Sequence, residues 1–196
     1  MTDRVRTRLV AATIALAVTA GVIAGSFALA SALGDDPEYD GSFVLDETGV
    51  FQQPLDDVNE DSSGERVPDT VLTDALGVEH RLSDLRGTPA VVNLWFSTCV
   101  PCRRELRDFA TVDAELGGSV QFVGVNPFDT VDAMERFAAE RGVEYPLWRD
   151  PDRAMSDALG VVGYPVTLFV AADGEILRQT GEIDADELRA AIEELF

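Results

Sequence analysis

The only two cysteines of the chain are Cys99 and Cys102, in the sequence CVPC. The apolar run before them, residues 90–96, is typical of a short buried strand. After them, apolar residues recur at the spacing of an amphipathic helix, at Leu106, Phe109, Val112 and Leu116. Pro101 suits a first helical turn, where its missing N–H needs no partner. The sequence therefore predicts a dithiol where a buried strand passes into a helix.

The N-terminus of a helix stabilises a negative charge, because its first N–H groups are unpaired and the helix dipole is positive there. A thiolate carries such a charge, so we expect Cys99 to have a lowered pKa and to be reactive. Half of a zinc site and a small structural disulfide share the C-x-x-C spacing. Zinc normally takes four ligands, and His80 is the only histidine, while a disulfide that closes so short a loop adds little stability. Redox chemistry is therefore the favoured interpretation.

The composition argues against a nucleic-acid binder. The 196 residues include 36 acidic and 15 basic residues, and the formal net charge is −21. A surface of that charge repels phosphate groups, whereas a nucleic-acid-binding protein needs a basic face. We therefore expect no nucleic-acid partner, and we expect neither a metal nor a cofactor.

Residues 1–33 are predicted to be an N-terminal membrane anchor or signal sequence. Three arginines within the first eight residues precede an uncharged stretch, residues 9–33, which is longer than the roughly 20 apolar residues that span a bilayer. The basic flank places the N-terminus in the cytoplasm and the rest of the chain outside. A cleaved signal peptide is the alternative, although its apolar core is normally about 7–15 residues long. We expect a single-pass protein of the cell membrane with an extracytoplasmic C-terminal domain.

Residues 34–66 carry eleven acidic residues and one arginine, which is typical of an acidic flexible linker. A globular domain is expected over residues 67–196. Its first two strands are predicted to be short, and His80 is expected to be an exposed residue of the second. The predicted strands are 70–73, 79–82, 90–96, 120–126, 166–171 and 175–179, and further helices are predicted at 130–141, at 150–160 and from 184.

The order of these elements is strand, helix, strand, helix, and then a hairpin and a last helix. Parallel strands joined by helices and followed by an antiparallel pair form a mixed sheet. We therefore expect an α/β fold with a mixed central sheet that helices cover on both faces.

Several motifs in a fixed order make residues 67–196 resemble a known family. They are VVNLWFSTCVPCRRE around the dithiol, FVGVNPFD, the YP at 145–146, and GVVGYPVTLFVAADGEI. With these motifs the chain resembles thioredoxin-fold proteins of the redoxin/AhpC-TSA superfamily. Among them it is most similar to the membrane-anchored thiol–disulfide oxidoreductases of the TlpA/ResA type, a group that includes the reductants of cytochrome c maturation.

The resemblance implies roles for four residues. Cys99 would be the exposed cysteine that attacks a substrate disulfide, and Cys102 the buried cysteine that resolves the mixed disulfide. Pro165 would be a cis proline that faces the dithiol, with the backbone of Tyr164 available to pair with a substrate segment. Cis X-Pro bonds are uncommon and mark a specific local geometry.

Two further residues complete the predicted site. Trp95, in the strand before the dithiol, is also assigned to substrate binding. Glu105 matches a glutamate of the family, and its spacing of three from Cys102 on a helix puts both residues on one face. We expect Glu105 to tune the Cys102 thiol or to accept its proton. The alternative is an exposed charge paired with Arg104 or Arg107.

The chain departs from the cytosolic thioredoxins at two positions. Asn93 replaces an aspartate in the strand six residues before the first cysteine, and an amide cannot accept a proton, so any buried base must be another residue. Thr98 replaces the tryptophan that usually precedes the first cysteine, which alters the surface that a partner meets at Cys99.

The resemblance also implies the partners: exported proteins with cysteine pairs, apocytochrome c among them, and a membrane electron donor that restores the dithiol. If the thiol–disulfide exchange proceeds in the reverse direction, the same residues make an oxidase that forms disulfides in exported proteins. A thiol peroxidase is disfavoured, because Phe96 stands where those enzymes carry a threonine. A copper-delivery protein is disfavoured because it would need C-x-x-x-C and a histidine after the pair.

Overall fold

The computed structural model describes residues 58–196, in which seven strands form one sheet. The order across this sheet is β2-β1-β5-β4-β3-β6-β7. Strand β4 pairs in parallel with β3 and β5, while the other neighbours pair antiparallel, which confirms the predicted mixed sheet. The strands are β1 (Leu72–Thr73), β2 (Glu79–His80), β3 (Ala90–Leu94), β4 (Gln121–Asn126), β5 (Leu147–Arg149), β6 (Val166–Val170) and β7 (Ile176–Thr180).

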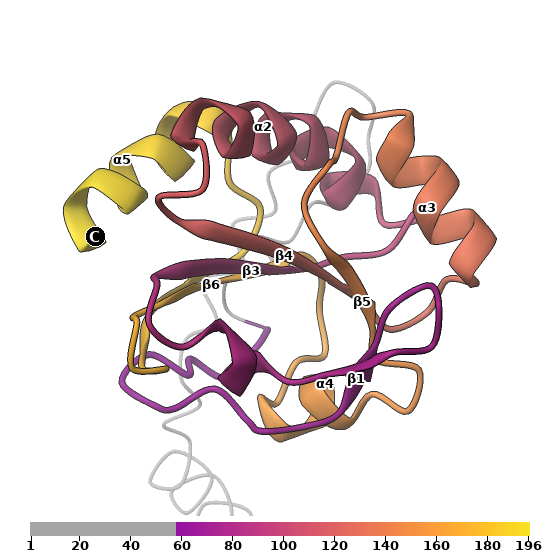
Figure 1. Ribbon diagram of the computed structural model, residues 1–196, viewed down its shortest axis with the longest axis horizontal. Helices are drawn as coiled ribbons and strands as arrows, with labels where there is room; N and C mark the ends of the chain where they lie inside the picture. Colours follow the sequence, from indigo (N-terminus) through magenta and orange to yellow (C-terminus); the bar gives the residue numbers. More distant parts are fainter. Residues whose placement is uncertain (1–57) are drawn as a thin grey trace, which may run out of the picture. The chain divides into compact units, whose positions relative to one another are not determined.

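Helices cover both faces of the sheet: α2, α3 and α5 lie above it and α4 below it in Figure 1. Helix α3 begins after Thr130, whose hydroxyl accepts a hydrogen bond from the backbone of Ala133. Helix α5 begins, as predicted, after Asp184, which forms a capping box with Glu187. The helices are α2 (Val100–Leu116), α3 (Val131–Ala139), α4 (Ala154–Ala158) and α5 (Ala185–Leu195), and a 3-10 helix, η2, spans Leu82–Leu85.

The predicted anchor, residues 1–33, and the linker as far as residue 57 lie outside the described residues. Within residues 58–196, no helix combines the length and apolar character needed to cross a bilayer.

Residues 58–66, which the charge pattern assigned to the linker, instead pack on the domain. The backbone N–H of Gly64 donates to the carbonyl of Ile176, and the N–H of Ile176 donates to the carbonyl of Glu65, both at 2.8 Å. The segment thus pairs with the outer edge of β7. Charge composition could not reveal this pairing, because it depends on backbone groups and not on side chains.

The start of α4 differs from its prediction. A helix was predicted over residues 150–160, but α4 begins at Ala154. Asp150 is buried, and its carboxylate accepts hydrogen bonds from the backbone N–H groups of Met155 and Ser156 at 3.2 and 2.9 Å. Asp150 therefore still accepts hydrogen bonds from the first N–H groups of the helix, although it lies four residues before Ala154 in the sequence.

Strand β5 was not predicted, since three residues are too few to show a periodic pattern. It places Trp148 against His80, with 4.9 Å between ring centroids and 8° between ring planes. The Nε2 atom of His80 also lies 3.2 Å from the carboxylate of Asp74. His80 is therefore half-buried and stacked, and the expectation of an exposed residue was wrong.

Candidate active site

The dithiol lies at the N-terminus of α2, as the sequence predicts. Cys99 is the N-cap residue, and its Sγ atom accepts a hydrogen bond from the backbone N–H of Cys102 at 3.3 Å. The two cysteines form a disulfide, with their Cα atoms 5.3 Å apart. An N-cap position directs the Cys99 sulfur at the unpaired N–H groups of the helix, which favours a thiolate there when the disulfide is reduced.

Cys99 is less exposed than expected. It retains 6% of its accessible surface and Cys102 retains none, so the order of exposure agrees with the predicted roles, but Cys99 is close to buried. The physical reason is the neighbouring loop: the Cys99 Sγ atom lies 3.6 Å from the carbonyl oxygen of Tyr164. The loop therefore covers part of the approach to the Cys99 sulfur.

The Tyr164–Pro165 bond is cis, as the resemblance implied. Both residues are buried, and the carbonyl of Tyr164 points towards the dithiol. The loop before them is held by Asn59, whose Oδ1 atom accepts from the N–H groups of Val162 and Gly163 at 2.8 Å each. Sequence reasoning missed Asn59, because it lies more than one hundred residues before the loop that it contacts.

The Tyr164 side chain is anchored by a buried polar network. Its hydroxyl donates to the Ser156 hydroxyl at 3.0 Å, and the Ser156 hydroxyl donates to the Asp150 carboxylate at 2.9 Å. Arg153 also donates to the Tyr164 hydroxyl, at 3.3 Å. Through these bonds α4 fixes the residue that faces Cys99.

Glu105 lies on the buried face of α2 with 2% of its surface exposed. Its Oε1 atom accepts from the Asn93 side chain at 2.9 Å, and its Oε2 atom accepts from the backbone N–H of Ile183 at 3.3 Å. The alternative of an exposed charge paired with Arg104 or Arg107 was wrong, since Arg104 pairs with Glu182. Glu105 is therefore the buried titratable group of this site, since the amide of Asn93 does not titrate.

Burial raises the pKa of Glu105 to about 8, and the hydrogen bonds from Asn93 and Ile183 offset only part of this effect. A carboxyl with this pKa is mostly protonated at neutral pH. Its pKa is close to the usual value of a cysteine thiol, about 8.5. Two groups of similar pKa exchange a proton readily in either direction, so Glu105 is suited to proton exchange with the dithiol.

Trp95 does not form part of the accessible site. The side chain is fully buried and packs against Phe137, with 5.8 Å between ring centroids. Gly124 on the neighbouring strand leaves room for it, because a Cβ atom there would lie 2.7 Å from Trp95 Nε1. Its assignment to substrate binding was therefore wrong; the residue is a core residue beneath the dithiol.

An aromatic cluster of Phe96, Phe128 and Tyr164 lies beside the dithiol, since Tyr164 is the residue that faces Cys99. Their ring centroids lie 5.1–5.5 Å apart, and Phe128 is 51% exposed. Asn126 positions Phe128, because its Oδ1 atom accepts from the backbone N–H of Phe128 at 3.1 Å. Sequence reasoning did not identify Phe128, although it belongs to the FVGVNPFD motif.

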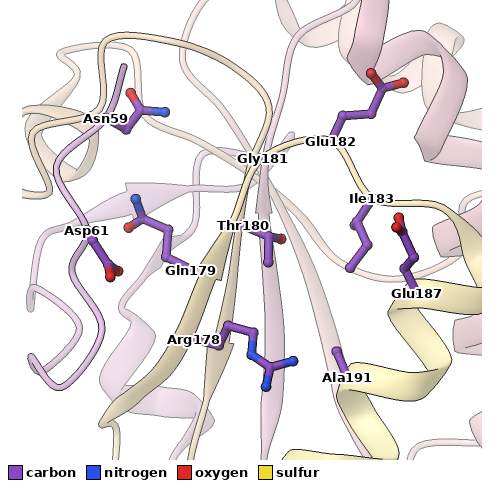
Figure 2. Close-up of a pocket in the computed structure, with 10 residues that line it drawn as sticks. All are labelled: Asn59, Asp61, Arg178, Gln179, Thr180, Gly181, Glu182, Ile183, Glu187 and Ala191. Atoms are coloured by element: carbon purple, nitrogen blue, oxygen red, sulfur yellow. The ribbon is translucent and has the colours of Figure 1, made fainter. Parts of the chain in front are cut away.

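A pocket of about 690 Å³ lies between the segment around Asn59, strand β7 and the start of α5 (Figure 2). Ile183, whose N–H donates to Glu105, lines this pocket, but neither cysteine nor Pro165 does. The pocket therefore does not include the dithiol or the cis proline.

The fold and the site define a thioredoxin-fold protein with a redox-active cysteine pair. Residues 63–186 match the model of the AhpC/TSA family, and the chain belongs to this family. The chain is a disulfide oxidoreductase, as the relatives and structures that resemble it indicate.

Two relatives and two solved structures illustrate the similarity. The thiol-disulfide oxidoreductase ResA of Geobacillus kaustophilus is 31% identical over 136 residues, which cover 67% of this chain and 77% of ResA. The thiol:disulfide interchange protein HelX of Rhodobacter capsulatus is 35% identical over 139 residues, which cover 68% and 77%. DsbF of Mycobacterium tuberculosis superposes with a TM-score of 0.61 and 28% identity, covering 66% of this chain and 99% of DsbF. A secreted disulfide oxidoreductase of M. tuberculosis, homologous to E. coli DsbE, gives 0.58 and 26%, with coverage of 65% and 96%.

Proposed function

We propose that this chain reduces disulfides of exported proteins outside the cytoplasmic membrane, with Cys99 as the attacking and Cys102 as the resolving cysteine. The observation that carries the proposal is the buried carboxyl of Glu105, held on the face of α2 that also bears Cys102. The substrate class is that of cytochrome c maturation, apocytochromes with an oxidised cysteine pair. The basic N-terminal flank and the uncharged residues 9–33 support the location.

The exchange proceeds in two displacements. The Cys99 thiolate attacks one sulfur of the substrate disulfide, so that a Cys99–substrate disulfide forms and the second substrate sulfur leaves as a thiolate. In the fraction of molecules in which Glu105 is ionised, Cys102 then gives its proton to that carboxylate and attacks Cys99 Sγ. The Cys99–Cys102 disulfide forms and the first substrate sulfur leaves as a thiolate. The dithiol loses two electrons, the substrate gains them, and both substrate thiolates take protons from water.

Tyr164 and Pro165 serve as the substrate-binding loop in this proposal. The Tyr164 carbonyl beside Cys99 Sγ is placed to pair with the backbone of a substrate segment that presents its sulfur to Cys99. The exposed ring of Phe128 extends this surface with an apolar contact for the substrate. A membrane protein with a reduced cysteine pair would return the two electrons.

Glu105 also supports the direction of electron flow. In strong oxidants of this kind, positive surroundings lower the pKa of a cysteine thiol, and the thiolate stabilises the reduced form. A buried carboxyl offers no positive charge to a Cys102 thiolate, and its ionised form would repel that thiolate. The reduced pair therefore gives up its electrons readily, as a reductant requires.

The reduction potential of the Cys99–Cys102 pair tests the direction. Equilibration with glutathione or dithiothreitol buffers should give a value below about −200 mV, in the range of thioredoxin and glutaredoxins. The reduced protein should also reduce a peptide that carries an oxidised C-x-x-C-H sequence. A potential above about −150 mV, together with oxidation of the reduced peptide, would instead establish a disulfide-forming oxidase.

A further inference from the structure

Arg103, Arg107 and Arg141 form a positively charged patch beside the dithiol. Arg103 directly follows Cys102, and Arg107 lies one turn further along α2 on the same face. Arg141 follows α3, and its guanidinium lies 3.4 Å from the centroid of the Phe137 ring. The guanidinium of Arg103 approaches the same ring, at 5.1 Å. The patch thus joins α2 to the end of α3 over one aromatic ring.

These arginines differ from most others in residues 58–196. Within this range neither Arg103 nor Arg107 pairs with a carboxylate, and Arg141 reaches only the exposed Glu140, at 3.6 Å. Burial lowers the pKa of Arg141, and the charges of Arg103 and Arg107 lower it further. The arginines that do pair with carboxylates of other elements or turns are Arg66, Arg81, Arg104, Arg153, Arg178 and Arg189.

A cluster of positive charges without acidic partners is energetically unfavourable, and the chain has enough acidic residues to neutralise it. Like charges four residues apart on a helix repel each other. The sequence has more than twice as many acidic as basic residues, yet no carboxylate of residues 58–196 neutralises Arg103 or Arg107. Charges held unpaired beside a reactive group create a local field that orients an approaching partner.

We propose that the patch of Arg103, Arg107 and Arg141 docks an acidic segment of the partner protein whose cysteines react at Cys99. This inference rests on the proposed disulfide exchange and adds its selectivity. The net charge of −21 repels an acidic partner over most of the surface. The encounters that lead to reaction are therefore those in which the acidic segment of the partner faces the patch. Because Arg103 donates to the carbonyl of Ser97 at 3.0 Å, two residues before Cys99, that orientation also brings the partner's sulfur towards Cys99. Guanidinium groups suit this task, since each binds a carboxylate through two parallel hydrogen bonds.

The test uses three peptides with the same internal disulfide, flanked by aspartates, by serines or by lysines. The full chain in detergent is reduced and mixed with each peptide at about 0.02 M and about 0.5 M salt, which changes the screening length severalfold. The readout is the ratio of the rate constants for the acidic and serine peptides, so that any general effect on the dithiol cancels. If the chain acts as an oxidase, the same ratio is measured with the dithiol peptides.

In the wild type the ratio should exceed one at low salt and fall towards one at high salt. The double variant Arg103→Glu, Arg107→Glu should lower the ratio about threefold to tenfold and raise the rate of the lysine peptide. The pair Arg103→Lys, Arg107→Lys should retain part of the preference, because the charges remain. Arg86→Glu is the matched control, since Arg86 is exposed and precedes β3 at the end of the strand away from the dithiol; it should leave the ratio unchanged.

Equal ratios in the wild type and the double reversal would overturn the proposal, as would a wild-type ratio below one. The chain's own acidic residues between 35 and 57 are the competing occupant. If they cover the patch, the ratio would stay near one and would rise when they are replaced by amides, and that result would also overturn a partner as the occupant. Failure of the proposed exchange itself would appear differently, as inactivity towards all three peptides in both directions.

Discussion

The side chain of Asn93 donates a hydrogen bond to the carboxyl of Glu105, with 2.9 Å between Nδ2 and Oε1. Asn93 lies on β3, at the position where cytosolic thioredoxins carry an aspartate, and Glu105 lies on α2. The amide thus holds a carboxyl that the helix supplies. The buried acid of this chain is therefore a helix residue, on the face of α2 that also bears Cys102.

The first prediction concerns stability at different pH values. The pKa of Glu105 is about 8 in the folded protein and about 4.5 for a solvent-exposed glutamate, so the unfolded chain releases this proton first as pH rises. Wild-type stability should therefore fall between about pH 4.5 and pH 8, by up to a few kcal/mol. Glu105→Gln removes this fall, so its free energy of unfolding relative to the wild type should be higher at pH 8 than at pH 5.

Urea unfolding of the oxidised proteins at the two pH values measures this difference. Glu135→Gln is the control, since Glu135 is exposed on α3. An equal dependence on pH in the wild type and Glu105→Gln would show that Glu105 does not titrate with a raised pKa.

The second prediction concerns the resolving step. A positioned general base typically contributes about 10²–10⁴-fold to a rate. Glu105→Gln should slow release of substrate from the mixed disulfide at least about tenfold, while formation of that disulfide by Cys99 changes less. Rapid quenching with acid, followed by mass spectrometry, separates the two steps. Glu105→Asp should restore part of the rate and of its pH dependence; a purely structural role would not distinguish Asp from Gln in this way.

The third prediction concerns the network behind Tyr164. Ser156→Ala removes one of the three hydrogen bonds that the buried Asp150 carboxylate accepts, and it leaves the Tyr164 hydroxyl without an acceptor, with only the bond from Arg153. Leaving buried polar groups short of partners should cost about 1–3 kcal/mol of the free energy of unfolding. Tyr164→Phe is the matched control, because it keeps all three bonds to Asp150 and should cost less. Chemical denaturation measures both, and a larger loss in Tyr164→Phe would argue against Asp150 as the centre of the network.

The fourth prediction concerns Asn59, whose side chain holds the loop before Pro165. Asn59→Ala should speed the hydrogen exchange of the Val162 and Gly163 amides, since both donate to Asn59 Oδ1. Asn59→Asp keeps that acceptor and loses only the bond to the Gly163 carbonyl, so it should preserve protection of both amides. Unchanged exchange in Asn59→Ala would mean that the loop is held by its other contacts.

The sequence predicted the features that neighbouring residues determine. The helices predicted at 130–141 and from 184, and the dithiol at the start of α2, all follow from local spacing and backbone chemistry. Because these rules act within a few residues, the alternation of strands and helices also followed from them.

The features that it missed depend on distant parts of the chain. Trp95 is buried because Phe137 and the space above Gly124 receive it, and Cys99 is nearly buried because the Tyr164 loop lies against it. Likewise, nothing near Asn59 in the sequence indicates that it binds a loop more than one hundred residues later. Such contacts are decided by packing between elements, which residue patterns along the chain do not encode.

The most direct test of the account is to trap the partner on Cys99. In Cys102→Ser the resolving sulfur is absent, so a substrate that reacts with Cys99 should remain attached through a disulfide that reductants release and mass spectrometry maps to Cys99. The Cys99→Ser variant should trap nothing. Absence of any trapped species in Cys102→Ser, while Cys99 still reacts with an alkylating agent, would contradict disulfide exchange at this site.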